Sequence, residues 1–255
     1  MNNNFQLDKW LKYLLNLKIR LKNNDENFNP SLISIINKPN YIIRKALYKS
    51  KKKYIAKITG DVLDIGCGNK PYEKLFVNNT KYVGLDTKSS GHKHKKENID
   101  VYYDGKIFPF EDNSFDNAVC FQVLEHVEDI ELFFHEVTRV IKKDGFILFD
   151  MPFVWEEHEL PYDFRRYTSI GIQKVLKQNN LRLVKYERYC DGLEMIPQFI
   201  NLYFRKLYNY KELKLFTNIV GVMPMNILGE IFSKINLKFT TIYGGHIFLA
   251  QNIKK

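Results

Sequence analysis

The chain has 255 residues, of which 45% are hydrophobic and 27% charged, and it contains few glycines and prolines. This composition excludes a collagen-like or intrinsically disordered protein, and the length favours one domain with additions at its ends over two equal domains. The formal net charge is +10, and residues 1–60 carry all of the excess because they hold thirteen basic and three acidic side chains. Such a segment is either a solvated helical face or a surface that attracts anionic lipid, a phosphorylated substrate or nucleic acid.

The cysteines and the apolar runs bear on the cellular compartment. Cys67, Cys120 and Cys190 are far apart and form no CxxC pair, so the sequence predicts neither a disulfide framework nor a zinc site. The first residues lack the charged, apolar and small-residue regions of a signal peptide. The nearest approach to a membrane-spanning run is 215–232, which polar residues interrupt. We therefore expect a cytoplasmic protein.

Residues 1–60 are predicted to form a basic helical extension. Within 5–21, apolar residues recur at roughly helical spacing with lysines between them, which indicates an amphipathic helix. Residues 31–58 again look helical and contain a basic run at 49–53. The extension ends where the pattern changes, at Asp61.

From Asp61 onward, short β-rich runs are separated by helical ones. The candidate strands are VLDI (62–65), YVGLD (82–86), DVYYD (100–104), NAVCF (117–121), FILFDM (146–151), RLVKYERY (182–189) and HIFLAQ (246–251). The clearest helix is 131–143, with Gly145 as its stop. This order predicts an α/β fold with a Rossmann-like, seven-stranded, mostly parallel sheet. The core then covers 61–190, an apolar helical insertion or lid covers 191–241, and the last strand lies within 242–255.

The first strand is followed directly by two glycines, Gly66 and Gly68. In an open α/β sheet, ligands bind at the carboxyl ends of the strands, and glycine lets the backbone approach a ligand that a Cβ would block. The next strand ends in Asp86, twenty residues after Gly66, where a carboxylate can accept both ribose hydroxyls. A third acid, Asp104, ends the third strand. The pattern therefore indicates a nucleoside cofactor.

Two such cofactors compete for this site. A dinucleotide needs a third glycine where this chain has Pro71, whose ring removes an N–H that a pyrophosphate would use. S-adenosylmethionine needs the two glycines for close approach and an acid for its ammonium group, which Asp64 supplies. Pro71 is then a suitable first residue for a helix over 71–76.

These residues resemble the class I S-adenosylmethionine-dependent methyltransferases of the type 11 group, with matching order and spacing over about 62–176. The resemblance rests on VLDIGCGNKPYEKLF, YVGLD, DGKIFPFEDNSFDNAV, FQVLEHV, HEVTRVIKKDGFILFDMP and HELPYDFRRYT. It implies that Asp64, Gly66 and Gly68 hold the methionine part of the cofactor, Asp86 the ribose, Asp104 and Gly105 the adenine edge, and Gln122 the rim. The chain departs from the fuller pattern at Lys70, where many members have a third glycine, and this could narrow the site.

The acceptor side is expected after the fourth and fifth strands. The resemblance places Glu125 and His126 near the cofactor's methyl end, so His126 is a candidate base, although a lone histidine is more often structural. The segment 155–168 is dense in polar and aromatic groups, as substrate loops are. In it, His158 could be a general base oriented by Glu159 or Asp163.

The same segment offers candidate substrate contacts. Arg166 could bind a substrate phosphate or carboxylate, Tyr167 could stack on a ring, and Glu159 could contact the acceptor. The structural alternative is a loop closed by an Asp163–Arg166 ion pair, with Thr168 capping the next helix. A metal site made of His158 and the acids has no diagnostic spacing, so none is predicted.

The predicted function is methyl transfer from S-adenosylmethionine, with an O-methylated sugar or other small molecule of a bacterial surface-glycan or related pathway as the leading acceptor. That acceptor class rests on resemblance. The apolar insertion beside the basic extension leaves open a lipid-like or quinone-precursor acceptor and peripheral contact with an anionic membrane at its inner face. A nucleic-acid partner is not favoured because no RNA-binding module accompanies the charge. The remaining alternative is a non-catalytic, methyltransferase-like binding partner. The oligomeric state cannot be read from the sequence.

Overall fold

The computed structural model describes residues 28–77, 81–88, 98–235 and 241–255. They form a seven-stranded sheet of order β3-β2-β1-β4-β5-β7-β6. β7 runs antiparallel to both of its neighbours, and the other pairs are parallel. The strands are β1 (Asp61–Ile65), β2 (Lys81–Thr87), β3 (Val101–Tyr103), β4 (Phe115–Phe121), β5 (Ile141–Pro152), β6 (Leu181–Asp191) and β7 (Tyr243–Asn252). The predicted mostly parallel α/β sheet is confirmed.

Alternation along each strand sends side chains to two apolar layers, one on each face of the sheet. Leu63 and Ile65 of β1 pack on the face covered by α4 (Ile130–Val140) and α5 (Ser169–Gln178). Val62 packs on the opposite face, which is covered by α3 (Tyr41–Ile55). Parallel strands covered on both faces are apolar throughout, as the runs in the sequence are.

Helix α3 therefore belongs to the core, although its sequence lies in the basic segment. Tyr54, Ile55 and Ile58 are buried against Val119 of β4 and Leu148 of β5. The boundary at residue 60 marks a change in composition rather than a separate folding unit. The amphipathic helix predicted over 5–21 lies outside the described residues.

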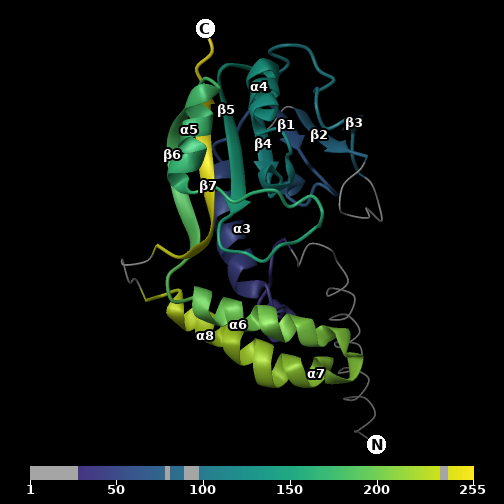
Figure 1. The fold of residues 1–255 in the computed structure, drawn as a ribbon, viewed down its shortest axis with the longest axis vertical. Coiled ribbons are helices and arrows are strands. Elements are labelled where there is room, and N and C mark those ends of the chain that lie inside the picture. Colours follow the sequence, from purple (N-terminus) through teal and green to yellow (C-terminus); the bar gives the residue numbers. More distant parts are fainter. Residues whose placement is uncertain (1–27, 78–80, 89–97, 236–240) are drawn as a thin grey trace, which may run out of the picture.

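The insertion before the last strand is helical, as predicted. It contains α6 (Met195–Lys206), the 3-10 turns η4 (Leu207–Asn209) and η5 (Lys211–Leu213), α7 (Lys214–Phe216), the π-helical turn η6 (Thr217–Val222) and α8 (Met223–Phe232). Figure 1 shows these helices as a layer beyond the carboxyl ends of the parallel strands, with α3 reaching from the sheet toward them. By length and composition, Lys214–Phe232 is the one helical stretch of the described residues that could cross a membrane.

Buried amides join this layer to the first turn of α3 and to the segment before it. Asn226 of α8 donates hydrogen bonds to the carbonyls of Ile35, in α2 (Ser34–Asn37), and of Lys38, over 2.8 and 3.1 Å. Gln198 of α6 accepts from the Ile43 amide at 3.2 Å. Both amide side chains are fully buried, and a buried amide is stable only with such partners. These hydrogen bonds hold the insertion against the N-terminal segment.

The helix predicted over 131–143 is shorter in the structure. α4 starts at the cap Asp129, whose side chain accepts from the Leu132 amide, and ends at Val140. Ile141 already pairs with Phe115 of β4, so sheet pairing replaces the last predicted turn. Gly145 lies within β5 and serves close packing, because a Cβ there would lie 2.2 Å from a β4 carbonyl oxygen.

Two short elements complete the fold around the site. Residues predicted as a helix at 71–76 form only the 3-10 turn η2 (Glu73–Leu75), because Tyr72 and Phe76 on either side of it both turn into the core. After β4, the 3-10 turn η3 (Leu124–His126) leads toward α4.

Candidate active site

A cavity of about 1550 Å³ opens at the carboxyl ends of β1, β2 and β4. Typical small-molecule sites measure roughly 300–1,000 Å³, so this space is large enough for a cofactor and an acceptor together. Its sheet end is lined by Asp64, Gly66, Gly68, Asp86, Asp104, Gly105 and Gln122. Its helical end is lined by Lys38, Arg44, Lys51, Trp155, Arg205, Tyr208 and Lys214. Every cofactor residue expected from the sequence lies in the first group.

The glycine loop has the backbone conformation that its sequence suggested. Gly66 and Gly68 have φ angles of 70° and 49°, in the left-handed region that favours glycine. A Cβ on Gly66 would lie 2.3 Å from Cγ2 of Val123, so the loop after β4 also requires a glycine here. The loop can therefore present its backbone to a ligand at close range.

Asp86 links the loop to the end of β2. Its Oδ2 accepts from the Gly68 amide at 2.8 Å, and its Oδ1 accepts from the Thr87 amide at 2.7 Å. A carboxylate offers about four acceptor positions, so positions remain for the two hydroxyls of a ribose. Asp86 thus both shapes the loop and faces the cavity.

Asp64 is 3% exposed and accepts a hydrogen bond from the Tyr82 hydroxyl. Burial raises the pKa of Asp64 to about 7, although the Tyr82 hydrogen bond and the Lys51 charge oppose the rise. A buried carboxyl in this state gains from a neighbouring cation, because the cation favours the ionised form. The position suits the ammonium group of S-adenosylmethionine.

The sequence suggested that Lys70, in place of a glycine, could narrow the cofactor site. In the structure Lys70 is not among the residues that line the cavity. Its φ of 51° keeps the left-handed conformation. Its side chain turns away and pairs with Asp100 at 2.5 Å, while Asp100 also accepts from the Gly84 amide at 2.7 Å. A Cβ on Gly84 would lie 2.5 Å from Cε of Lys70 and 2.6 Å from Sγ of Cys67. A larger residue at this position in β2 would therefore displace both side chains.

Asp104, Gly105 and Gln122 lie at the cavity wall. Asp104 accepts from the Lys106 and Ile107 amides, and these bonds lower its pKa. Gly105 has a φ of 87°. The Gln122 amide donates to Asp150 at 2.6 Å and to the Tyr189 hydroxyl at 3.2 Å, so its nitrogen is held by the protein rather than by a ligand.

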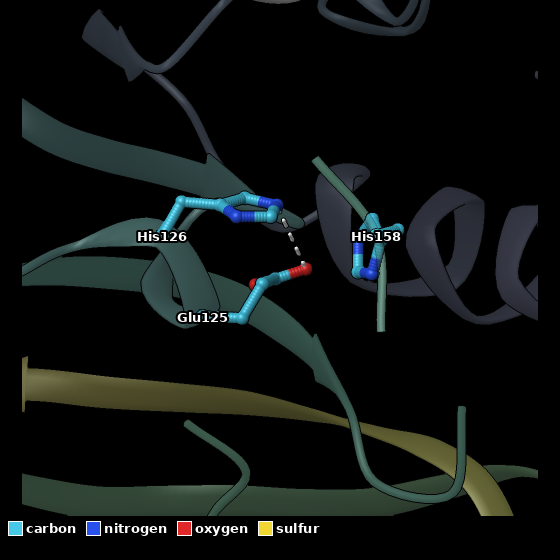
Figure 2. A group of neighbouring side chains, drawn as sticks. All are labelled: Glu125, His126 and His158. Atoms are coloured by element: carbon cyan, nitrogen blue, oxygen red, sulfur yellow. Dashed lines mark ion pairs between the residues drawn. The ribbon is translucent and has the colours of Figure 1, made fainter. Parts of the chain in front are cut away.

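The candidate bases meet at one side of the cavity (Figure 2). The rings of His126, on η3, and His158, on the loop after β5, are 4.9 Å apart and edge to face. Nε2 of His126 lies 4.0 Å from Oε1 of Glu125 and 3.8 Å from Oε2 of Glu159. Burial lowers the pKa of His158 despite the nearby Asp163 carboxylate. The structure thus brings together three of the predicted residues, His126, His158 and Glu159.

The structure gives the candidate substrate contacts Arg166 and Tyr167 partners within the protein, and it contains the Asp163–Arg166 ion pair of the structural alternative. Arg166 donates two hydrogen bonds to Asp163, at 2.5 and 2.8 Å, and this pairing lowers the pKa of Asp163 to about 2. Tyr167 packs against the core cluster. None of the three is among the residues that line the cavity. Arg166 and Tyr167 therefore close the loop. Asp163 contacts His158, because its carboxylate accepts a hydrogen bond from the His158 backbone amide at 3.0 Å.

The sequence interpretation missed the residues that α3 contributes. Lys51 lies in the cavity wall with its ammonium 4.1 Å from the centre of the Tyr72 ring and 4.4 Å from that of Phe121. It was one of several similar lysines in a basic run. Its spacing of four residues from Leu47 and from Ile55 on one helical face was the available signal.

Comparison with known proteins points to one kind of enzyme. Residues 63–149 match the family model described as a methyltransferase domain. An uncharacterized protein of Methanocaldococcus jannaschii is 34% identical over 170 residues, which are 66% of this chain and 75% of that protein. The ubiquinone biosynthesis O-methyltransferase of Pelagibacter ubique is 32% identical over 130 residues, 47% of this chain and 51% of that enzyme. Two further curated relatives from Methanocaldococcus jannaschii are matched over only 57% and 40% of their lengths.

Solved structures support the fold. An S-adenosylmethionine dependent methyltransferase from Mesorhizobium loti aligns with a TM-score of 0.51 and 13% identity, over 81% of this chain and 97% of that chain. The cyclase SpnF aligns with a TM-score of 0.51 and 18% identity, over 80% of both chains. Since a cyclase shares this fold, the fold alone does not define the reaction or the acceptor.

Proposed function

Because this chain belongs to the class I S-adenosylmethionine-dependent methyltransferases, we propose that it methylates a hydroxyl group of a sugar or similar small molecule that also carries an anionic group. A bacterial surface-glycan or related pathway is the setting that the resemblance of its substrate loop suggests.

The observation that carries this proposal is the lining of the helical end of the cavity. It contains the basic side chains Lys38, Arg44, Arg205 and Lys214 together with the aromatic rings of Trp155 and Tyr208. Guanidinium and ammonium groups bind phosphate and carboxylate, and aromatic rings offer an apolar face to a sugar. Arg205 forms an ion pair with the Glu156 carboxylate. The guanidinium carbon of Arg44 instead lies 5.6 Å from the centre of the Phe28 ring. Arg44 is therefore our leading anion contact.

The sheet end of the cavity accommodates the cofactor. The Gly66–Gly68 backbone and Asp64 would hold its methionine part, Asp86 its ribose, and Asp104 with Gly105 its adenine edge. When bound, S-adenosylmethionine supplies an electrophilic methyl group on its sulfonium. The protein then has to align the acceptor oxygen with that methyl group and exclude water.

His126 is the proposed base. Its Nδ1 lies 2.9 Å from the Tyr162 carbonyl, and because a carbonyl only accepts, Nδ1 carries the hydrogen. Nε2 is left with the lone pair that can take the acceptor's hydroxyl proton. The deprotonated oxygen could then accept the methyl group that the bound cofactor would supply.

A panel of acceptors tests the proposal. Formation of S-adenosylhomocysteine would be measured with a neutral hexose, a hexose phosphate, a nucleotide sugar and a catechol. We expect turnover with an anionic sugar, a KM at least tenfold higher in Arg44→Ala, and a lower kcat in His126→Ala. Arg182→Ala is the matched control, since Arg182 is on the exposed side of β6 and bonds Gln251. Turnover of the catechol alone, or an unchanged KM in Arg44→Ala, would contradict the proposal.

A second candidate is methylation of a lipid-like or quinone-precursor acceptor at a membrane surface. Its support is an exposed apolar patch on the insertion, formed by Leu215, Phe216, Ile219, Val220, Ile227 and Ile231. Phe216 is 64% and Val220 58% exposed. An apolar patch beside basic residues is typical of peripheral membrane proteins. One relative is named as an O-methyltransferase of ubiquinone biosynthesis.

Sedimentation with liposomes separates the two candidates. The membrane candidate predicts that the protein binds vesicles containing phosphatidylglycerol at low salt, and that Phe216→Ser with Val220→Ser weakens this binding. Val184→Ser is the control, because Val184 is 39% exposed on β6, away from the patch. A protein that stays in the supernatant with all vesicles would exclude this candidate and leave the first one standing.

A further inference from the structure

Glu125, His126 and His158 form a cluster with the arrangement of a metal site. Each offers one ligand atom, and these atoms lie within 4.8 Å of one another. Glu125 and His126 come from η3 and His158 from the loop after β5, so the fold brings together residues more than thirty positions apart. We propose that these three side chains bind a divalent transition-metal ion.

Glu125 provides the first argument. Its side chain is fully buried, and neither carboxylate oxygen has a hydrogen-bond partner in the part of the chain that the structure describes. A buried carboxylate without donors is costly. A bound cation would supply the missing partner. In Figure 2 the carboxylate extends toward the space beside the two imidazole rings.

The histidines provide the second argument, because their other nitrogens are already occupied. Nδ1 of His126 faces the Tyr162 carbonyl at 2.9 Å. Nδ1 of His158 faces the Glu156 carbonyl at 3.2 Å and the Asp163 carboxylate at 3.3 Å. Oxygen acceptors on Nδ1 hold the ring hydrogen there and leave the lone pair on Nε2, as is usual for histidines that bind a metal ion. Arg166 in turn holds Asp163.

The distances suit an ion after a small contraction. Ligand atoms at 2.0–2.2 Å from a metal ion lie about 3–4 Å apart, so the cluster would tighten by about 1 Å. Glu159 Oε2, at 3.8 Å from His126 Nε2, is close enough to be a fourth ligand. Two imidazoles with one or two carboxylates favour Zn²⁺, Mn²⁺ or Fe²⁺ over Mg²⁺ and Ca²⁺, which prefer oxygen ligands alone.

Such an ion would face the space between the cofactor and the acceptor ends, because His126, His158 and Glu159 line the cavity. With Nε2 of His126 bound as a ligand and no longer available as a base, the ion itself would promote loss of the hydroxyl proton, by binding the acceptor oxygen and lowering its pKa. This catalytic role rests on the proposed function. The binding of the ion does not, so the two can fail separately.

Cobalt titration tests the binding directly. Protein dialysed against a chelator would be titrated with Co²⁺ and followed by visible absorption, with Zn²⁺ as the competitor. We expect bands from one equivalent of Co²⁺ that Zn²⁺ abolishes. Glu125→Gln and His158→Gln should each weaken Co²⁺ binding at least tenfold. Asp163→Asn should weaken it about 10–100-fold, because Asp163 holds the His158 ring in place. Circular dichroism checks that each variant is folded.

A matched control removes the other histidines that could bind cobalt. These are His92 and His94, outside the described residues, and His135, whose side chain is 70% exposed on α4. The triple Gln variant should keep the wild-type cobalt spectrum. Loss of the bands in this control, or equal affinity in wild type, Glu125→Gln and His158→Gln, would overturn the proposal and leave the cluster as a set of proton-transfer groups. Absence of methyl transfer with intact cobalt binding would instead argue against the proposed function.

Discussion

Lys51 of α3 and Asp150 of β5 form an ion pair with Nζ and Oδ1 3.2 Å apart, and neither side chain is exposed. The pair connects the basic N-terminal segment to the strand that ends at the cavity. Asp150 also accepts from Gln122, so one buried carboxylate organises both the wall and the rim of the site. The Lys51 ammonium, enclosed by aromatic rings, compensates for the burial of that carboxylate.

Replacing Lys51 with Met should destabilise the protein strongly, by about 3–5 kcal/mol, because Asp150 would remain buried without its partner charge. Urea unfolding would measure this change. Lys53→Met is the matched control, since Lys53 pairs with Glu187 at the surface and its side chain is 58% exposed. Exposed pairs contribute little, so the control should change stability far less. Equal losses in the two variants would show that the Lys51–Asp150 pair is not decisive.

Replacing Asp86 with Ala should weaken the binding of S-adenosylmethionine and of S-adenosylhomocysteine by tenfold or more. Each hydrogen bond to a charged group contributes about 1.5–3 kcal/mol, and the substitution also releases the Gly68 amide. Isothermal titration would measure both affinities. Asp112→Ala is the control, because Asp112 pairs with Arg139 away from the cavity. Wild-type affinity in Asp86→Ala would contradict the assignment of the ribose site.

Asp64 should make stability depend on pH. Its folded-state pKa, raised to about 7 by burial, exceeds the usual value of about 3.9, so the folded state holds a proton that the unfolded state has lost between these pH values. Its contribution to stability is therefore lost as the pH rises from about 4 to 7. Tyr82, Lys51, Asp86 and Lys70 are the ionisable groups that act on it.

Asp64→Asn does not titrate, so its free energy of unfolding relative to wild type should increase across the same pH range. Urea unfolding of both proteins at pH 4.5, 6 and 7.5 would measure the difference. A difference that stays constant with pH would mean that Asp64 is ionised throughout the range and that burial does not dominate its pKa.

Arg166→Ala should lower the stability of the protein but leave the KM for the acceptor unchanged. Asp163 would keep its buried charge and lose two hydrogen bonds, at a cost of about 3–5 kcal/mol. The acceptor KM should stay near the wild-type value in the folded fraction of the variant, whereas Arg44→Ala should raise it. A stable Arg166→Ala protein with a much higher KM would instead support a substrate contact for Arg166.

Local patterns were sufficient for much of the fold. Short β-rich runs of four to eight residues marked each strand. The helical cap predicted at Thr168 is confirmed, since its side chain accepts from the Gly171 amide three residues later. These signals depend on neighbours within a few positions. The end of α4 was misplaced because the competing partner of Ile141 is Phe115, which lies in another strand.

Adjacent residues were enough to predict the sheet, the glycine loop and the acids at the ends of the first three strands, because strand alternation and backbone conformation depend on near neighbours. Which charges are buried, and which groups they contact, follows instead from the tertiary fold. Lys51 and Lys53 are similar in sequence, yet one faces Asp150 inside the protein and the other lies at the surface. Likewise, Glu125 acquires His158 as a neighbour only when the loop after β5 folds back over η3. Contacts between distant segments set burial and charge pairing, and no local pattern encodes them.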